Sequence, residues 1–220
     1  MKELLVTMTS DFICPWCWIG HQNLKMAIAE AGVDADAVQM QFIPFELNPD
    51  LPKEGVNRKA YRSRKFGSWE RSQAMDAEVV RAGERAGLTF NYDQVLVTPN
   101  TRLAHRLMRW AASQDECNAP AELADAIFTA YFSQGRDIGN VEVLLEITAS
   151  VGLDADAAAK FLDSGAGEQE VVDQAQLAQR LGTRSVPEFS LMSGRIVISG
   201  AQVPNVLARA ILAAGEAMED

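Results

Sequence analysis

Two cysteines separated by two residues stand where a short apolar segment of the chain gives way to a helical pattern, in LLVTMTSDFICPWCWIGHQNLKMAIAE. Residues 4–9 are apolar and partly β-branched, which predicts a buried strand. From Pro15 onward the apolar residues recur near a spacing of 3.6, and Gly32 fits the end of a helix. We therefore expect Cys14 and Cys17 at the amino end of a helix that follows a strand.

This placement favours redox chemistry over the other uses of a cysteine pair. A structural zinc site needs four ligands, whereas the chain has a single Cys-x-x-Cys pair and two histidines, His21 and His105. A disulfide across two residues removes little entropy from the unfolded chain, which argues against a purely structural bridge. Unpaired N–H groups and the helix dipole at a helix start favour a thiolate, and Pro15 pre-sets the turn. Cys14 should therefore attack a disulfide and Cys17, one turn further, should resolve it.

The remainder of the chain divides into three parts. Residues 38–45 read as a second strand, so that the chain opens with a strand–helix–strand unit. Residues 55–163 show helical segments without strand alternation, at 58–65, 68–86, 100–113, 120–134, 140–150 and 154–163. A helix over about 168–181, two strands joined at Ser193–Gly194 and a last helix from Pro204 to about residue 217 follow. The two ends should form one sheet, with the helical block inserted between them.

The charge balance and cysteine content exclude several classes of protein. The chain has 220 residues with 30 acidic and 20 basic side chains, a formal charge of −10, which opposes nucleic-acid binding and attraction to anionic membranes. No apolar run approaches the roughly 18 residues of a membrane span, and the first residues do not resemble a signal peptide. Three cysteines are too few for a secreted disulfide scaffold. We expect a cytoplasmic protein.

Five stretches spread over nearly the whole chain resemble one family. They are SDFICPWCWIG, PFELNP, NTRLAHRL, SVPEF and SGAQ. Together they resemble the DsbA superfamily of thioredoxin-fold oxidoreductases and, within it, the cytoplasmic FrnE-like group. The resemblance implies an α/β thioredoxin fold (βαβ…αββα) with a large all-helical insertion. Its discontinuous thioredoxin-like domain would cover 1–50 and 165–220, and the inserted helical domain 51–164.

The resemblance also implies which residues meet the substrate. Pro187 corresponds to the cis-proline of the thioredoxin fold, although cis bonds form only about 5–6 % of X–Pro bonds in folded proteins. Val186 would then lie beside the catalytic dithiol and pair with an extended substrate chain, while Pro15 and Trp16 would complete the contact surface. Glu188 departs from the family, which often has an aromatic residue there, and should place a carboxylate near the thiols.

Two further residues are candidates for proton transfer. His21 follows Cys17 by four residues and should share its helical face, with a half-exposed helix histidine as the alternative. Glu46 ends the second strand and could accept the proton of Cys17, with a solvated strand-end carboxylate as the alternative.

The basic residues and the third cysteine have open interpretations. The stretch NTRLAHRL makes Asn100, Arg102 and His105 candidates for bordering the active-site groove, and a solvated helix face is the alternative. The basic run NRKAYRSRK reads as a solvated face. Cys117, between two predicted helices, reads as a bystander thiol with a regulatory role as the alternative.

The leading hypothesis is a thiol–disulfide oxidoreductase that exchanges its Cys14–Cys17 dithiol with protein or peptide disulfides, without a metal or organic cofactor. Glutathione is a further candidate partner. The alternative is a glutathione-linked transferase or isomerase of small aromatic compounds, of the chromene-carboxylate isomerase or kappa-class type. Those enzymes are similar in architecture but typically carry serine where Cys14 stands. A third hypothesis is a binding or holdase module that uses the groove without turnover.

Overall fold

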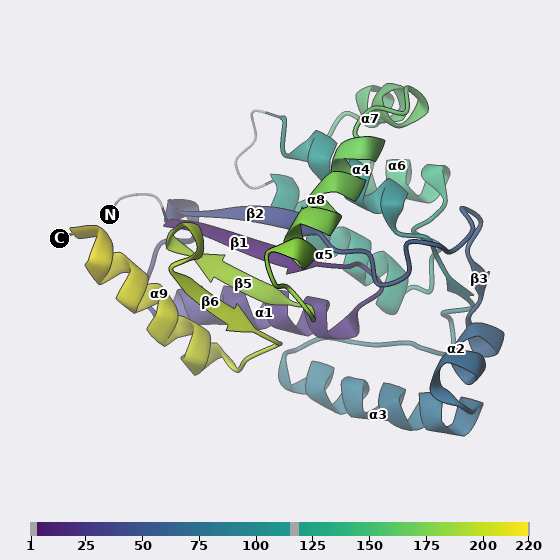
Figure 1. Cartoon of the computed structure of the whole chain (residues 1–220), viewed down its shortest axis with the longest axis horizontal. Helices are drawn as coiled ribbons and strands as arrows, with labels where there is room; N and C mark the ends of the chain where they lie inside the picture. The colour runs from purple at the N-terminus through teal and green to yellow at the C-terminus, as the bar shows by residue number, and fades with distance from the viewer. Residues whose placement is uncertain (1–3, 115–118, 220) are drawn as a thin grey trace.

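The computed structural model of the chain describes residues 4–114 and 119–219, so Cys117 lies outside the described residues. A four-stranded sheet in the order β2-β1-β5-β6 forms the centre (Figure 1). Its strands are β1 (Leu4–Ser10), β2 (Val38–Pro44), β5 (Glu188–Leu191) and β6 (Ile196–Ser199). β1 runs parallel to β2 and antiparallel to β5, so the two ends of the chain build one sheet, as predicted.

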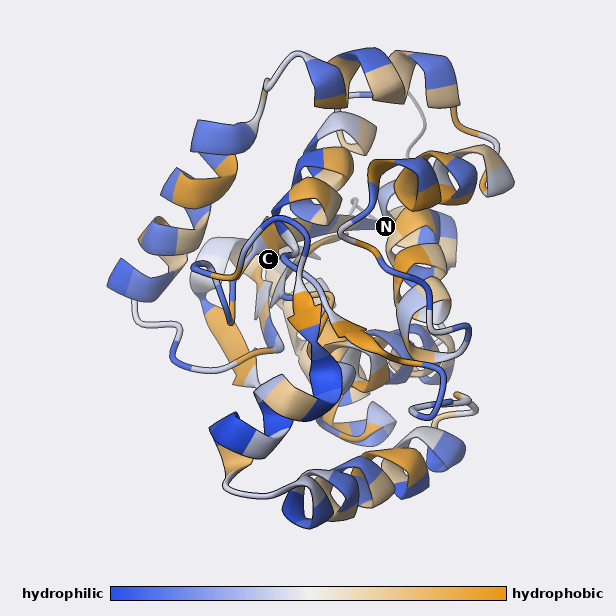
Figure 2. Ribbon diagram, turned by 90° about the vertical axis from the view of Figure 1, so that its right-hand side faces the viewer, coloured by the Kyte–Doolittle hydropathy of each residue, from blue (hydrophilic) through white to orange (hydrophobic). Residues whose placement is uncertain are grey.

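Helices cover both faces of this sheet. On one face α1 (Pro15–Glu30) packs beside α9 (Pro204–Glu219), while α8 (Glu168–Arg180) crosses the other face near β2 (Figure 1). β1 is buried along most of its length because both faces are covered. Hydrophobic residues accordingly concentrate on the central strands and on the inner sides of the helices (Figure 2).

The segment between β2 and α8 is mostly helical. It contains α2 (Arg58–Phe66), α3 (Trp69–Arg85), α4 (Arg102–Ala111), α5 (Ala119–Phe132), α6 (Val141–Ser150) and α7 (Ala155–Asp163). Asn140 and Asp154 cap α6 and α7 with their side chains, which accept hydrogen bonds from backbone N–H groups of the first turn. The segment also holds two strands of two residues each, β3 (Val56–Asn57) and β4 (Val97–Thr98), which pair antiparallel. The predicted all-helical insertion therefore differs from the structure at these two strands. Two residues are too few to show the alternation that marks a strand in a sequence.

The hairpin between β5 and β6 differs from the predicted two-residue turn. The last paired residues are Leu191 and Ile196, so four residues connect the strands and include a short 3₁₀ turn, η2 (Met192–Gly194). Met192 and Ser193 both have positive φ angles, of 53° and 54°. Another 3₁₀ turn, η1 (Ala35–Ala37), precedes β2.

One hydrophobic cluster continues from the sheet into the helical segment. Trp18 of α1 stacks on Phe132 of α5 with ring centroids 5.9 Å apart and meets the edge of Phe90 at 4.9 Å. Phe128 of α5 lies 4.9 Å from Phe12, which precedes α1. α1 is therefore fixed between the sheet and α5. No helix in residues 4–114 and 119–219 is both long and apolar enough to cross a membrane.

Candidate functional site

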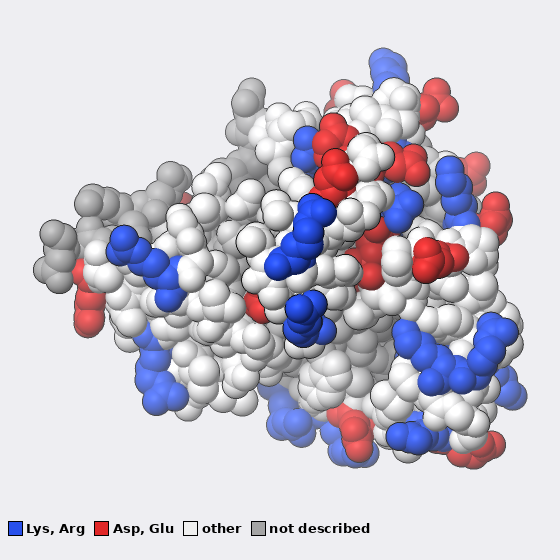
Figure 3. Space-filling view, in the orientation of Figure 1, with Lys and Arg blue, Asp and Glu red and all other residues white. Residues whose placement is uncertain are grey.

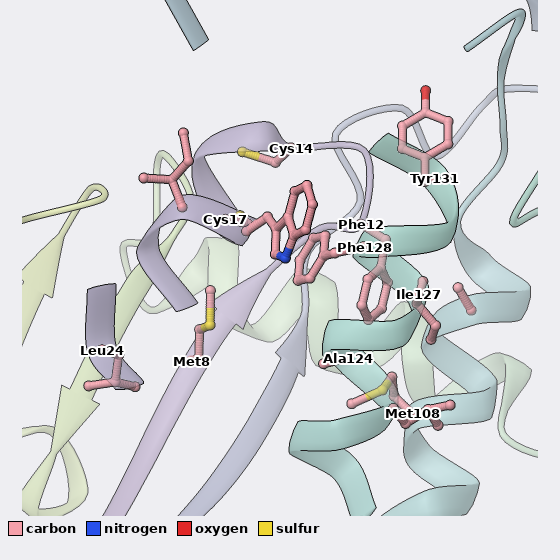
Figure 4. Close-up of a cluster of buried hydrophobic side chains, with 14 of the residues drawn as sticks. Met8, Phe12, Cys14, Cys17, Leu24, Met108, Ala124, Ile127, Phe128 and Tyr131 are labelled. Atoms are coloured by element: carbon pink, nitrogen blue, oxygen red, sulfur yellow. The ribbon is translucent and has the colours of Figure 1, made fainter. Parts of the chain in front are cut away.

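Cys14 lies at the amino end of α1, directly after β1 and a short turn (Figure 4). Its backbone N–H donates to the carbonyl of Asp11 at 3.0 Å, and its own carbonyl accepts from Cys17 N–H at 3.0 Å. Cys14 is the N-cap and Pro15 occupies the first helical position, where a missing N–H costs nothing. Cys14 therefore lies at the positive end of the helix dipole.

Cys17 lies beneath Cys14 in the apolar core and is fully buried, whereas Cys14 retains 6 % exposure. Both are free thiols in this structure. Burial raises the pKa of the Cys17 thiol well above its usual value, and the neighbouring Cys14 side chain and the Asp11 carboxylate raise it further. The backbone of Asp11 opposes this rise in the pKa of Cys17 through a hydrogen bond. The two thiols thus occupy different environments one turn apart.

The loop before β5 comes directly against the first thiol. The Cys14 Sγ atom lies 3.6 Å from the Val186 carbonyl oxygen, to which the thiol can donate. The Val186–Pro187 peptide bond is cis, and the Pro187 carbonyl accepts from Gly200 N–H at 2.8 Å. A Cβ atom at Gly20 of α1 would lie 2.8 Å from Pro187 Cγ. Glycine at this position therefore lets the proline loop approach α1 closely.

A pocket of about 250 Å³ opens beside Cys14. α1 and its preceding loop form one side of it, and α2, α3 and α5 form the other. Trp16 and Leu47 at its rim are 42 % and 40 % exposed, and Met75 is 38 % exposed. The pocket therefore combines a thiol with an accessible apolar rim.

The opposite wall of the pocket is basic and aromatic. Arg58 donates to Asp76 Oδ2 at 2.7 Å and lies 4.7 Å above the ring of Tyr92, and Arg62 donates to Asp76 Oδ1 at 2.8 Å. Arg58 is buried, so the prediction of a solvated face is wrong for this residue. A planar guanidinium can be buried when it stacks on a ring and pairs with a carboxylate. The other basic residues of α2 gather on the surface seen in Figure 3.

Glu46 and Arg102, both predicted near the site, pair with each other. Arg102 Nε and Nη2 donate to the two Glu46 carboxylate oxygens at 3.0 and 2.9 Å. The Asn100 side chain donates to the Leu51 carbonyl and accepts from Arg102 N–H. These contacts hold the loop after β2 against the start of α4. The Glu46 carboxylate thus pairs with the Arg102 guanidinium. Asn100 and Arg102 are not among the residues that line the pocket beside Cys14.

His21 contacts a carboxylate of α5. Its Nδ1 atom lies 3.0 Å from Asp125 Oδ1 of α5, and its ring meets the edge of Phe42. Lys25 donates to the second Asp125 oxygen at 2.6 Å. A residue four positions after Cys17 shares its helical face but lies one turn further along the axis, where α5 supplies a carboxylate. His21 is buried, not half-exposed.

Asp11 is the buried acid nearest the dithiol, and the sequence reasoning missed it. Its side chain is fully buried, and one carboxylate oxygen accepts from Leu47 N–H at 2.7 Å. The other oxygen lies 3.5 Å from Nε2 of His105, the third predicted groove residue. The available signal was an aspartate between an apolar strand and the Cys-Pro-Trp-Cys sequence.

Glu188 turns to neighbouring hydroxyl groups. Its carboxylate accepts from Thr183 at 2.6 Å and lies 3.5 Å from the Ser199 hydroxyl. Within the described residues, no group of three or more His, Cys, Asp and Glu side chains has the arrangement of a metal site.

Comparisons with known proteins agree with this geometry. YwbO of Bacillus subtilis (strain 168), an uncharacterised protein, is 28 % identical over 208 residues, which is 94 % of each chain. The structure of a probable DsbA oxidoreductase from Streptomyces coelicolor superposes with a TM-score of 0.83 and 28 % identity, covering 97 % of this chain and 90 % of the other. The cytosolic disulfide reductase DsbM from Pseudomonas aeruginosa, solved with GSH, gives a TM-score of 0.68 and 20 % identity over 96 % of this chain and 98 % of its own.

The family profile of the DSBA-like thioredoxin domain matches residues 5–212. This span begins inside β1 and ends inside α9, so it includes the dithiol, the proline loop and the whole helical segment. The chain belongs to the family of DSBA-like thioredoxin domain proteins.

Proposed function

We propose that the protein is a thiol–disulfide oxidoreductase in which Cys14 is the attacking thiol and Cys17 the resolving thiol. The observation that carries the proposal is the contrast between the two sulfur atoms. Cys14 lies at the helix start, at the edge of a pocket and 3.6 Å from the Val186 carbonyl, whereas Cys17 is buried one turn below. A substrate sulfur can therefore reach the first thiol and not the second.

The exchange follows from this arrangement. The Cys14 thiolate attacks one sulfur of a substrate disulfide, forming a mixed disulfide and releasing the other sulfur as a thiolate. Cys17 loses its proton and attacks the Cys14 sulfur, which forms the Cys14–Cys17 disulfide and releases the second substrate thiolate. The substrate gains two electrons and the dithiol loses two, so no metal or organic cofactor takes part. The reverse sequence oxidises a substrate dithiol.

Peptide or protein segments are the proposed substrates. The exposed side chains of Trp16, Leu47 and Met75 around Cys14 offer an apolar surface to a flanking side chain. Val186 precedes the sheet and can pair with an extended backbone, with Pro187 holding that loop beside the thiol. The cytoplasmic location and the FrnE-like subgroup stay predictions.

One observation favours the glutathione-linked alternative as a second candidate. The pocket of about 250 Å³ has arginine and tyrosine side chains on its inner wall, which suit a small anionic or aromatic molecule. The second thiol argues for disulfide exchange, since a transferase or isomerase of this type needs no resolving cysteine.

A trapping experiment separates the candidates. The reduced Cys17→Ala variant is mixed with a synthetic peptide that contains one intramolecular disulfide, and separately with glutathione disulfide. We expect a stable mixed disulfide between Cys14 and the peptide, detected by mass spectrometry after acid quenching. The wild-type protein should release reduced peptide and acquire the Cys14–Cys17 disulfide.

The Cys14→Ala variant is the matched control, because it retains Cys17 in its buried position. It should form no peptide adduct. Adducts with glutathione alone would favour the second candidate, and absence of any adduct at Cys14 would overturn the oxidoreductase proposal.

A further inference from the structure

One face of α2 is basic and borders the pocket beside the dithiol. Five of the nine residues of α2 are arginine or lysine, and none is acidic. Arg58, Arg62 and Lys65 follow one another at spacings of four and three residues, so they share a helical face. All three line the pocket. Because the chain as a whole has a formal charge of −10, this face has the opposite charge to the rest of the protein.

The two arginines on this face are only partly neutralised. Asp76 of α3 accepts from Arg58 at 2.7 Å and from Arg62 at 2.8 Å. Arg62 Nε also donates to the Ser72 hydroxyl at 2.6 Å, and this partner is uncharged. One carboxylate therefore faces two guanidinium groups, and the set keeps a net positive charge.

Lys65 bonds to uncharged acceptors. Its Nζ atom donates to Asn48 Oδ1 at 2.8 Å and to the Tyr61 hydroxyl at 3.1 Å. Within residues 4–114 and 119–219 no carboxylate forms an ion pair with it. The side chain is exposed, and an ammonium group has three donors. One donor and the whole charge of Lys65 thus remain for a ligand in the pocket.

Glu78 of α3 is the opposing charge at the pocket. It is exposed and lines the pocket together with Asp76. Three cations therefore face two carboxylates across the lining, which leaves one positive charge. A ligand with a carboxylate suits this balance, and Glu78 limits how strongly it is preferred.

The pocket lies where the neighbours of a substrate cysteine are placed. Cys14 and Lys65 line the same pocket of about 250 Å³. The cube root of this volume, about 6 Å, corresponds to about two extended residues at 3.3–3.6 Å each. A side chain one or two positions from the reacting cysteine can therefore reach the basic face. The exposed apolar side chains of Trp16, Leu47 and Met75 at the rim suit the other neighbours of that cysteine.

We propose that the protein selects peptide or protein disulfides in which a glutamate or aspartate lies one or two positions from the reacting cysteine, and that Lys65 binds this carboxylate. The residual charge of the Arg58–Asp76–Arg62 set adds to the attraction. The proposal rests on the proposed oxidoreductase function and names the substrate class of the same site. Glutathione also has carboxylates, so the test below includes it as a separate arm.

The test compares three peptides that share one intramolecular disulfide. They differ only at the two positions before and after the first cysteine, which hold glutamate, glutamine or lysine. Reduced Cys17→Ala protein traps the mixed disulfide, and its rate of formation is measured by mass spectrometry after acid quenching. Each rate is divided by the rate at which dithiothreitol reduces the same peptide, because the pKa of the leaving thiol alters its own reactivity. An ionic strength of about 0.15 M limits charge effects to about 8 Å.

We expect the glutamate peptide to react about threefold to fivefold faster than the glutamine peptide, and the lysine peptide to react slowest. This is the upper part of the range for an exposed ion pair. Raising the ionic strength to about 0.5 M should shrink the preference, because salt screens exposed charges.

Two variants in the Cys17→Ala background should move the preference in opposite directions. Lys65→Gln should reduce the ratio between the glutamate and glutamine peptides to below about twofold. Glu78→Gln removes the opposing charge and should raise that ratio about twofold. The matched control is Lys59→Gln, which removes a charge from the same helix. Lys59 lies 5.8 Å from the centre of the Trp69 ring and does not line the pocket, so this variant should keep the parent ratio.

Circular dichroism and thermal melting confirm folding, and Glu78→Gln carries the test if Lys65→Gln does not fold. Equal normalised rates for the three peptides, or an equal loss of preference in Lys59→Gln and Lys65→Gln, would overturn the choice of acidic substrates and leave the oxidoreductase function intact. A larger effect of Lys65→Gln on glutathione disulfide than on the glutamate peptide would assign the site to glutathione and overturn the proposal. Absence of a mixed disulfide with any peptide would overturn the oxidoreductase function itself.

Discussion

Replacing Gly20 by alanine tests how closely the proline loop must approach α1. A Cβ atom at this position would lie 2.8 Å from Pro187 Cγ and 3.2 Å from Phe189 Cζ. Both neighbours are held in place, since the Pro187 carbonyl accepts from Gly200 N–H and Phe189 is a fully buried residue of β5. The added methyl group therefore has to push the loop or the helix aside.

The magnitude follows from comparison with a second glycine. Gly215 lies inside α9, and a Cβ atom there would meet no heavy atom within 4 Å. Glycine to alanine in a helix gains about 1 kcal/mol of unfolding free energy, and both variants receive this gain. Only Gly20→Ala also incurs overpacking, which costs about 1–3 kcal/mol. Gly20→Ala should thus be about 1–3 kcal/mol less stable than Gly215→Ala.

Urea unfolding and thermal melting of the two variants measure this difference. In a domain of this size 1 kcal/mol corresponds to about 2–4 °C in Tm, so Gly20→Ala should melt several degrees below Gly215→Ala. The rate of mixed-disulfide formation should change in Gly20→Ala alone, because Pro187 is bonded to Val186, whose carbonyl faces Cys14 Sγ. Equal stability and equal rates in the two variants would refute the close-approach argument.

Three further substitutions test contacts around the site. Burial opposes ionisation of Asp125, but His21 and Lys25 lower its pKa below the usual value of about 3.9. Asp125→Asn should therefore destabilise the protein at pH 7. Chemical unfolding at several pH values should show this loss of stability vanishing as the pH falls through the lowered pKa. A deficit unchanged at low pH would contradict this assignment. Glu46→Gln should cost about 1–3 kcal/mol of unfolding free energy, because the buried Glu46 side chain loses the charge that accepts two hydrogen bonds from half-buried Arg102. A loss below about 0.5 kcal/mol in urea titrations would contradict this. Phe128→Ala should cost about 3–5 kcal/mol, because the ring is fully buried among aromatic residues, and a calorimetric Tm within 2 °C of wild type would refute that.

The regular elements could be predicted because their signals are local. The α1 start at Pro15 combines a proline at the first helical position with apolar spacing of 3.6, and both act within a few residues. The caps at Asn140 and Asp154 are equally local. The β3–β4 pair joins residues about 40 positions apart by a two-residue ladder, and no local pattern encodes such a pairing. The division of the chain into residues 1–50 with 165–220 and 51–164 stays a prediction.

The candidate site likewise has features set by local sequence, which could be predicted, and features set by long-range contacts, which could not. Position on a helix predicted where Cys14 and Cys17 lie, since their spacing places both on one turn. Charged partners were not predictable, because pairing depends on which elements the fold brings together. Glu46 was a candidate for accepting the proton of Cys17, with a solvated carboxylate as the alternative, yet Arg102, 56 residues away in the sequence, donates to both of its oxygens. The sequence suggested no role for Asp11 for the same reason, because its neighbour His105 lies on α4, far from Asp11 along the chain.

The two halves of the site have separate physical tasks. The sheet and α1 fix the sulfur atoms: the turn at Asp11 sets the helix start, and Gly20 lets the proline loop reach Cys14. The helical segment supplies the far wall of the pocket, where Arg58 is committed to Asp76 and Tyr92. Because these interactions share no side chain with the dithiol, changes in α2 or α3 can alter which molecule enters without altering how the sulfur atoms exchange.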